Sequence, residues 1–290
     1  MSATITVHGT PRTYEVAGPA GGAPGRSLVI VFHGSKQTGA KHRQFTGRAY
    51  DTLAADGAAV VAYPDGYRGN WNDGRRGSSF PARRDGIDDV ALTRRLIDDL
   101  ARTHGIDPAR VYTVGFSNGG QMVMRLIHEA PELIAGAAVI AATMPAPDNF
   151  LAGDGPAVPM PTLLIHGTKD PISKYAGGTF SWWARKAFKV DGRNLSAPQT
   201  AEYFAARNGI TAAPTTTMLP AATRGTTVER TDFRQPGRPP VALLTVHGGG
   251  HTIPGPANQP FVLGRTNHDL DTAGLLAGFF GIANPTGVAR

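Results

Sequence analysis

The amino-acid sequence predicts an α/β fold, with a mostly parallel central sheet, helices on both of its faces and an antiparallel edge at the N-terminus. Two observations carry this prediction. Short apolar runs rich in β-branched residues alternate with segments of helical periodicity along nearly the whole chain. The apolar runs are continuous, as expected for parallel strands covered on both sides. The 290 residues are therefore expected to form one domain, 1–290, around one extended core.

Each expected element follows from its local pattern. The first two β-rich runs, TITVHG and RTYEVAG, predict an antiparallel hairpin. The segment from about 171 to 196 fits neither period and is expected to be a lid or insertion over the site. Buried strands are expected at 27–34, 58–66, 110–117, 133–143, 161–170 and 241–251, and helices at about 41–55, 87–103, 118–129, 197–208 and 269–280.

The composition excludes several classes of protein. With 41% hydrophobic and 18% charged residues, the chain is typical of a soluble globular protein. Its net charge of +7 comes from scattered arginines, with no basic stripe interleaved with aromatics, so we expect no nucleic-acid partner. The longest weakly polar run, Leu133 to Met144, is short of the roughly 20 residues of a membrane span. The absence of cysteine excludes thiolate nucleophiles, disulfides and cysteine metal sites.

The N-terminal residues MSATITVHGTPRTYEV lack the basic and apolar regions of a secretory signal. The chain is therefore expected to be cytosolic, or extracellular if it is a trimmed mature form. The sequence does not set the oligomeric state.

Ser117 is the candidate nucleophile. It lies in Gly115-Phe116-Ser117-Asn118-Gly119, which matches G-x-S-x-G between an apolar strand and a helix-compatible run. A sharp strand-to-helix turn would lift the hydroxyl above the sheet, and the glycines remove side chains that would collide there. The start of the helix would direct backbone N–H groups toward the same point.

A serine nucleophile needs a base to accept its proton and an acid to orient that base. Asp170 follows the strand TLLIHG and is preferred to Asp154, which lies in a Gly/Pro-rich loop with no strand before it. His251 is favoured as the base over His247, because three glycines allow it to turn back toward the serine. The order Ser, Asp, His is the one that accompanies this motif on an α/β sheet.

Two segments, the turn after Ser117 and the loop after the strand at 27–34, are expected to form an oxyanion hole. Its two N–H donors are expected from Asn118, directly after the nucleophile, and from Ser35, in the loop after an earlier strand. His33 and His166 each precede a glycine at a strand end and are interpreted as structural histidines that orient loops. No metal or nucleotide cofactor is expected.

Between about Leu28 and Phe280 the chain carries, in order, HGSKQTG, YPDGYRGNWNDGR, GIDDVALTRRLIDDL, GIDPARVYTVGFSNGGQMVMRL, HGTKDPISKYAGG and GGGHTIPG. These motifs resemble the poly(3-hydroxybutyrate) depolymerase and feruloyl esterase group of α/β-hydrolases. The resemblance implies an α/β-hydrolase fold, with Ser117, Asp170 and His251 as the triad and the N–H groups of Ser35 and Asn118 as the oxyanion hole.

The resemblance also implies a substrate-binding position at Trp71, in the NWN stretch. The family often has tryptophan after its histidine motif, where this chain has Ile253, and Val-Pro-Tyr after its aspartate, where this chain has Ile172-Ser173-Lys174-Tyr175. Both departures leave the catalytic groups in place and concern the specificity. The resemblance implies that Ile253, like Trp71, is a substrate-binding position.

The predicted function is hydrolysis of a small-molecule or polymeric carboxylic ester through an acyl-enzyme. The expected substrates are hydroxyalkanoate oligomers or feruloyl and acetyl esters. The alternatives are a peptidase or acyltransferase on the same fold, or a non-catalytic polymer-binding module. A dinucleotide-binding protein is disfavoured, because neither GPAGGAPG nor HGGGHT has the helix and acidic residue that such a motif requires.

Overall fold

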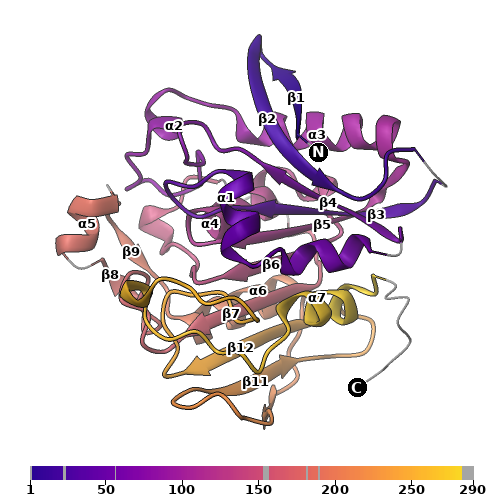
Figure 1. The fold of residues 1–290 in the computed structure, drawn as a ribbon. Helices are drawn as coiled ribbons and strands as arrows, with labels where there is room; N and C mark the ends of the chain where they lie inside the picture. The colour runs from indigo at the N-terminus through magenta and orange to yellow at the C-terminus, as the bar shows by residue number, and fades with distance from the viewer. Residues whose placement is uncertain are drawn as a thin grey trace.

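The computed structural model describes residues 2–21, 24–55, 57–152, 157–180, 182–188 and 190–282. Ten strands form one twisted sheet in the order β1-β2-β4-β3-β5-β6-β7-β12-β11-β10, and six adjacent strands from β4 to β12 run parallel (Figure 1). The strands are β1 (Ser2–Val7), β2 (Thr10–Ala17), β3 (Arg26–Phe32), β4 (Ala59–Pro64), β5 (Ile106–Phe116), β6 (Gly136–Ile140), β7 (Thr162–Gly167), β10 (Thr215–Met218), β11 (Thr227–Phe233) and β12 (Val241–His247).

The parallel strands are buried on both faces, as their continuous apolar runs predict. In β3, Leu28 and Ile30 belong to one hydrophobic cluster, whereas Val29 and Val31 belong to the cluster on the opposite face. The predicted mostly parallel sheet with an antiparallel N-terminal edge is thereby confirmed.

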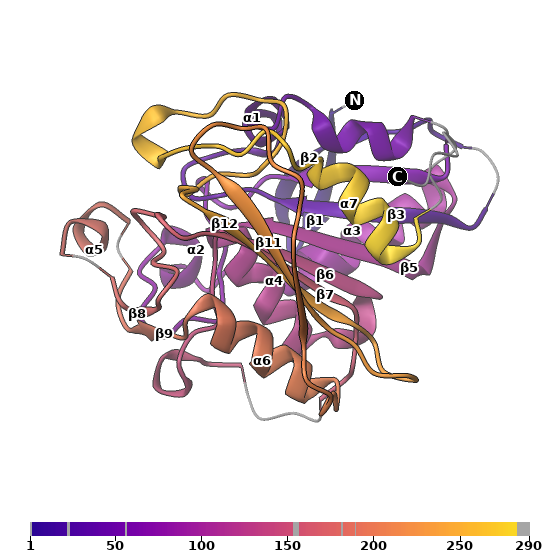
Figure 2. The same ribbon diagram turned by 90° about the horizontal axis from the view of Figure 1, so that it is seen from below.

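Helices cover both faces of the sheet (Figures 1 and 2). The first cluster contains side chains from α3, α4 and α6, and the second contains side chains from η1 and α7. These elements are α3 (Asp89–His104), α4 (Asn118–Glu129), α6 (Ala197–Arg207), η1 (Ala49–Ala54) and α7 (Thr272–Phe280).

Two expectations differ from the structure. The helix expected at 41–55 is divided into α1 (Gly39–Phe45) and the 3-10 helix η1, because Gly47 and Arg48 adopt left-handed φ angles of 62° and 60°. The second antiparallel edge, formed by β10 and β11, was not predicted. All four residues of β10 are exposed, so no apolar face marks that strand in the sequence.

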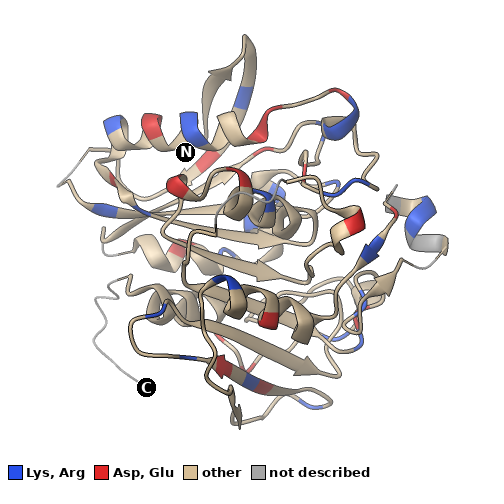
Figure 3. Cartoon of the chain, turned by 180° about the vertical axis from the view of Figure 1, so that it is seen from behind, with Lys and Arg blue, Asp and Glu red and all other residues tan. Residues whose placement is uncertain are grey.

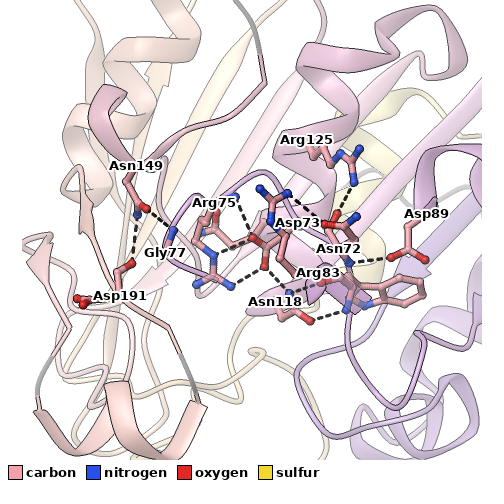
Figure 4. Close-up of polar contacts among 12 residues, drawn as sticks. Asn72, Asp73, Arg75, Gly77, Arg83, Asp89, Asn118, Arg125, Asn149 and Asp191 are labelled. Carbon is pink, nitrogen blue, oxygen red and sulfur yellow. Dashed lines mark hydrogen bonds and ion pairs between the residues drawn. The ribbon is translucent and has the colours of Figure 1, made fainter. Parts of the chain in front are cut away.

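The segment from 171 to 196 contains a two-stranded sheet of β8 (Gly178–Thr179) and β9 (Arg193–Asn194) and the helix α5 (Trp182–Phe188). Asn149 ties it to the domain. Its Nδ2 donates to the carbonyl oxygens of Asp191 and Arg193 at 3.4 and 3.2 Å, and its Oδ1 accepts from the Gly77 N–H at 2.9 Å (Figure 4). That this segment forms a lid over the site remains a prediction.

Charged residues of both signs are interspersed over the elements, α3 included (Figure 3). Of the helices in the described ranges, none combines the length and apolar character that a bilayer crossing requires.

Candidate active site

Ser117 lies at the turn between β5 and α4 in a strained backbone conformation, with φ 55° and ψ −116°. Its N–H donates to the carbonyl oxygen of Ile140 on the neighbouring strand at 2.9 Å. The side chain is half-buried, while the residues on either side of it are buried. Strain of this kind is a feature of turns that present a nucleophile above a sheet.

The glycines of the motif are required by close backbone approaches. A Cβ atom at Gly119 would overlap the carbonyl oxygen of Phe32 on β3, and one at Gly115 would overlap the carbonyl oxygen of Gly119. Side chains at these positions would therefore push α4 away from β3 and β5 and displace Ser117.

Asp170 and His251 lie together at the ends of β7 and β12. The Nδ1–H of His251 donates to Asp170 Oδ2 at 2.7 Å, and both side chains are buried. The Asp170 Oδ1 accepts from the backbone N–H groups of Ile172 and Ser173, each at 2.8 Å. With its Nδ1 engaged by the carboxylate, the ring of His251 has Nε2 available as a base.

The electrostatics keep Asp170 ionised. Burial alone would raise the pKa of its carboxyl, but the charge of His251 and hydrogen bonds from His166 and His251 lower that pKa well below its usual range. His166 Nε2 lies 3.4 Å from Asp170 Oδ2 and donates to the Ser173 carbonyl oxygen at 2.7 Å. His166, which was predicted to orient a loop, therefore also lies beside the Asp170 carboxylate.

The glycine run before His251 fits between two other loops. A Cβ at Gly250 would overlap the Leu263 carbonyl oxygen, which accepts the His251 N–H at 2.6 Å. The His251 ring lies with its centroid 5.0 Å from that of Phe116, the residue before Ser117. Within the described ranges no hydrogen bond joins Ser117 Oγ and His251 Nε2. In enzymes without bound substrate this contact is often long and tightens on binding.

Ser35 and Asn118 both line the cavity next to Ser117. Among the described residues, neither backbone N–H donates a hydrogen bond, which leaves both available to an oxyanion. The loop of Ser35 is held by His33, whose Nδ1 donates to the Gly34 carbonyl oxygen at 2.7 Å and whose Nε2 accepts the Gly66 N–H at 2.9 Å. This contact agrees with the structural role predicted for His33.

Trp71 does not line the cavity. It is fully buried, its Nε1–H donates to the His33 carbonyl oxygen at 2.9 Å, and its ring packs on Phe32 and His33. The Trp71 N–H donates to Asn118 Oδ1 at 2.8 Å. Trp71 is therefore not in the position expected of a substrate contact. Its hydrogen bonds instead hold the loops that carry Ser35 and Asn118.

Ile253 is also away from the cavity. It is 3% exposed, packs in the second cluster, and lines a separate small pocket with Tyr50 and Pro254. His247, the alternative base, is partly exposed, and its Nε2 lies 3.3 Å from Glu229. Asp154, the alternative acid, lies outside the described residues.

The wall of the cavity beside Ser117 includes residues that were not among the predicted site residues. Arg75, Phe80, Gln121 and Phe180 contribute to this wall. Arg75 forms a buried ion pair with Asp73, whose Oδ2 also accepts from Asn118 Nδ2 at 2.6 Å (Figure 4). In the described ranges, no group of three or more His, Asp or Glu side chains has the geometry of a metal site.

The comparisons with known proteins agree with this architecture. Residues 71–189 match the model of the phospholipase/carboxylesterase family of α/β-hydrolases. NocK of Nocardia uniformis subsp. tsuyamanensis, named as a proposed esterase, is 33% identical over 281 residues, which are 93% of this chain and 79% of that protein. Feruloyl esterase B of Piromyces equi is 30% identical, with 77% of this chain matched to 39% of that protein.

The acetyl xylan esterase of Aspergillus awamori is similar in fold. Its structure has a TM-score of 0.61 at 18% identity and covers 98% of this chain and 100% of its own. The elements expected of an α/β-hydrolase, a mostly parallel sheet with a serine at a strand-to-helix turn, are thus present over nearly the whole chain. The chain belongs to the esterases of the α/β-hydrolase superfamily.

Proposed function

We propose that this protein is a serine carboxylic-ester hydrolase in which Ser117, His251 and Asp170 form the catalytic triad. The observation that carries the proposal is the 2.7 Å contact of His251 Nδ1 with the buried Asp170 carboxylate, beside the turn that presents Ser117. A carboxylate in this position fixes the tautomer of the imidazole and stabilises the imidazolium that forms during reaction.

The reaction follows from these positions. His251 Nε2 takes the proton of the Ser117 hydroxyl as its oxygen attacks the ester carbonyl carbon. The resulting oxyanion accepts hydrogen bonds from the N–H groups of Ser35 and Asn118, and each such donor is worth about 3 kcal/mol of transition-state stabilisation. The imidazolium protonates the leaving alcohol, and a water molecule activated by His251 then releases the acid from the acyl-enzyme.

The substrate class is proposed from the relatives. Among them are feruloyl esterase B of Piromyces equi and poly(3-hydroxyalkanoate) depolymerase C of Paucimonas lemoignei, the latter 30% identical over 125 residues and matched over only 29% of its length. Feruloyl, acetyl or hydroxyalkanoate esters are therefore the substrates to compare.

Hydrolysis of p-nitrophenyl acetate and butyrate by the wild type and by Ser117→Ala tests the triad. We expect rapid turnover by the wild type, loss of at least 10³-fold in kcat for the variant, and a mass increase of one acyl group on the wild type alone. Full activity of Ser117→Ala would contradict the nucleophile assignment. Acyl-enzyme formation without release to water would favour an acyltransferase, and the absence of any acylation would favour a polymer-binding module.

A further inference from the structure

Asp170 faces two imidazoles, and the proposed reaction uses only one of them. His251 Nδ1 lies 2.7 Å from Asp170 Oδ2, and His166 Nε2 lies 3.4 Å from the same oxygen. His166 is near the end of β7, four residues before the aspartate, and is 2% exposed. The carboxylate of the proposed triad therefore has a second histidine beside it to which the reaction gives no function.

The contacts of His166 determine where its proton lies. Its Nε2 is 2.7 Å from the Ser173 carbonyl oxygen, which can only accept a hydrogen bond, so Nε2 carries the proton. Its Nδ1 is buried and has no hydrogen-bond partner among the described residues. A second proton there would leave a charged N–H group buried without an acceptor, which is costly. His166 is therefore a neutral donor, and it is not placed to accept the Ser117 proton in place of His251.

The ring of His166 has a fixed orientation. Tyr175 packs against it edge to face, with the ring centroids 5.9 Å apart and an interplanar angle of 75°. The Tyr175 hydroxyl lies 2.8 Å from Thr245 Oγ1, and Thr245 is the partner of His166 in the parallel pairing of β7 with β12. These contacts hold the ring in place and leave its Nε2–H to Ser173 and Asp170.

The turn that follows Asp170 closes on His166. The Asp170 Oδ1 accepts from the N–H groups of Ile172 and Ser173, and the carbonyl group of Ser173 accepts from His166. The circuit from Asp170 through Ser173 to His166 thus contacts both oxygens of the carboxylate. Without the donor of His166 the turn would lose its side-chain contact with β7, and the carboxylate would be freer to rotate away from His251.

We propose that His166 is a positioning residue for the proposed triad, a neutral donor that anchors the 170–173 turn and keeps the Asp170 carboxylate directed at His251. The inference rests on the proposed esterase function and goes beyond it by adding a residue that acts through Asp170. His166 takes no part in bond making or breaking.

Two substitutions at His166 test this role. His166→Phe removes the donor and keeps an aromatic ring, whereas His166→Gln provides an amide N–H in place of Nε2–H. With p-nitrophenyl butyrate, kcat of His166→Phe should fall about 10- to 100-fold at an unchanged KM, a smaller loss than the roughly 10⁴-fold that follows replacement of a triad aspartate by asparagine. His166→Gln should recover most of this loss. Thr245→Val, the matched control, removes the hydroxyl that Tyr175 contacts and should keep the wild-type kcat.

The proton between His251 and Asp170 provides a readout that needs no substrate. In a short charge-assisted hydrogen bond this proton should give a far-downfield resonance in the ¹H NMR spectrum, which His251→Asn identifies by its loss. The resonance should persist in His166→Gln and Thr245→Val, and should move upfield or exchange with solvent in His166→Phe. His166→Asn, whose amide is too short to reach the Ser173 carbonyl oxygen, is the second variant if His166→Phe does not fold.

The outcomes separate this proposal from the proposed function. Wild-type kcat with an unchanged resonance in His166→Phe, or equal losses in His166→Phe and Thr245→Val, would overturn the positioning role. If Ser117→Ala is inactive at the same time, the esterase mechanism stands and only the role of His166 is refuted. A resonance that responds to His166 in a protein without ester turnover would refute the esterase mechanism and retain the positioning of Asp170 by His166.

Discussion

Asn118 donates from its Nδ2 to Asp73 Oδ2 at 2.6 Å, so the residue that follows the proposed nucleophile also supports the buried ion pair of Arg75. The same side chain accepts the Trp71 N–H through its Oδ1. One amide thus connects the proposed oxyanion hole, the loop of Trp71 and the wall of the cavity. The backbone of Asn118 serves the reaction, whereas its side chain orders the surroundings.

Asn118→Ala should therefore reduce stability even though the backbone N–H remains. The substitution leaves the Trp71 N–H without a buried acceptor and removes one of the donors to Asp73, which keeps its ion pair with Arg75. The free energy of unfolding should therefore fall by about 1 to 3 kcal/mol. Urea unfolding followed by tryptophan fluorescence measures this loss. Asn118→Asp should be still less stable, because it places a second carboxylate beside Asp73. Equal stability of the three proteins would show that the amide contacts contribute nothing.

The two histidines at the end of β12 provide a matched pair for the proposed base. His251→Asn should reduce kcat on p-nitrophenyl butyrate by at least 10³-fold, because it removes the proton acceptor and the partner of Asp170. His247→Asn changes a partly exposed side chain that contacts Glu229, and should leave kcat within about twofold. The opposite ranking of the two variants would assign the base to His247.

Alanine substitutions at two helical glycines, one beside Ser117 and one on α7 as the control, test the packing of the nucleophile turn. Gly119→Ala should destabilise the protein by several kcal/mol and reduce activity, because its Cβ would overlap the Phe32 carbonyl oxygen and displace α4. Gly278→Ala on α7 meets no atom within 4 Å, and should be neutral or stabilise the helix by up to about 1 kcal/mol. Thermal unfolding of both variants measures the difference, and a stable, active Gly119→Ala would contradict the close approach.

The sequence was sufficient for the elements and residues whose signals are local. Continuous apolar runs marked the parallel strands, and Gly115 to Gly119 marked the turn at Ser117, because a backbone constraint is visible in the residue types that satisfy it. The assignment of Asp170 and His251 used their positions after strands, their order along the chain and the three glycines before His251. The sheet brings the ends of the two strands, β7 and β12, to the same edge.

Contacts between distant loops were not predictable in this way. Asp73, Arg75 and Gln121 have no local motif, and their importance arises from where β5, α4 and the 71–78 loop meet. Trp71 and Ile253 were expected at the substrate, but burial of an apolar side chain depends on what packs over it, and the structure places both in the hydrophobic clusters.

The buried neutral imidazole of His33 makes stability depend on pH. Burial lowers the pKa of His33 to about 4 from its ordinary value of 6.5. Between these values the unfolded chain binds a proton that the folded protein does not, so the free energy of unfolding falls as the pH decreases from about 6.5 to 4. The loss from His33 at pH 4.5 is on the order of 2 kcal/mol.

At neutral pH His33 Nε2 accepts a hydrogen bond from the Gly66 N–H. Protonation of His33 would turn Nε2 into a donor, so that two N–H groups would face each other and the Ser35 loop would be disturbed. Urea unfolding at pH 7 and 4.5 should show a smaller loss for His33→Gln than for the wild type. His128, whose pKa burial lowers to about 4, acts in the same direction, and His128→Gln offers a second variant if His33→Gln does not fold. Equal losses in the wild type and both variants would mean that other groups determine the acid sensitivity.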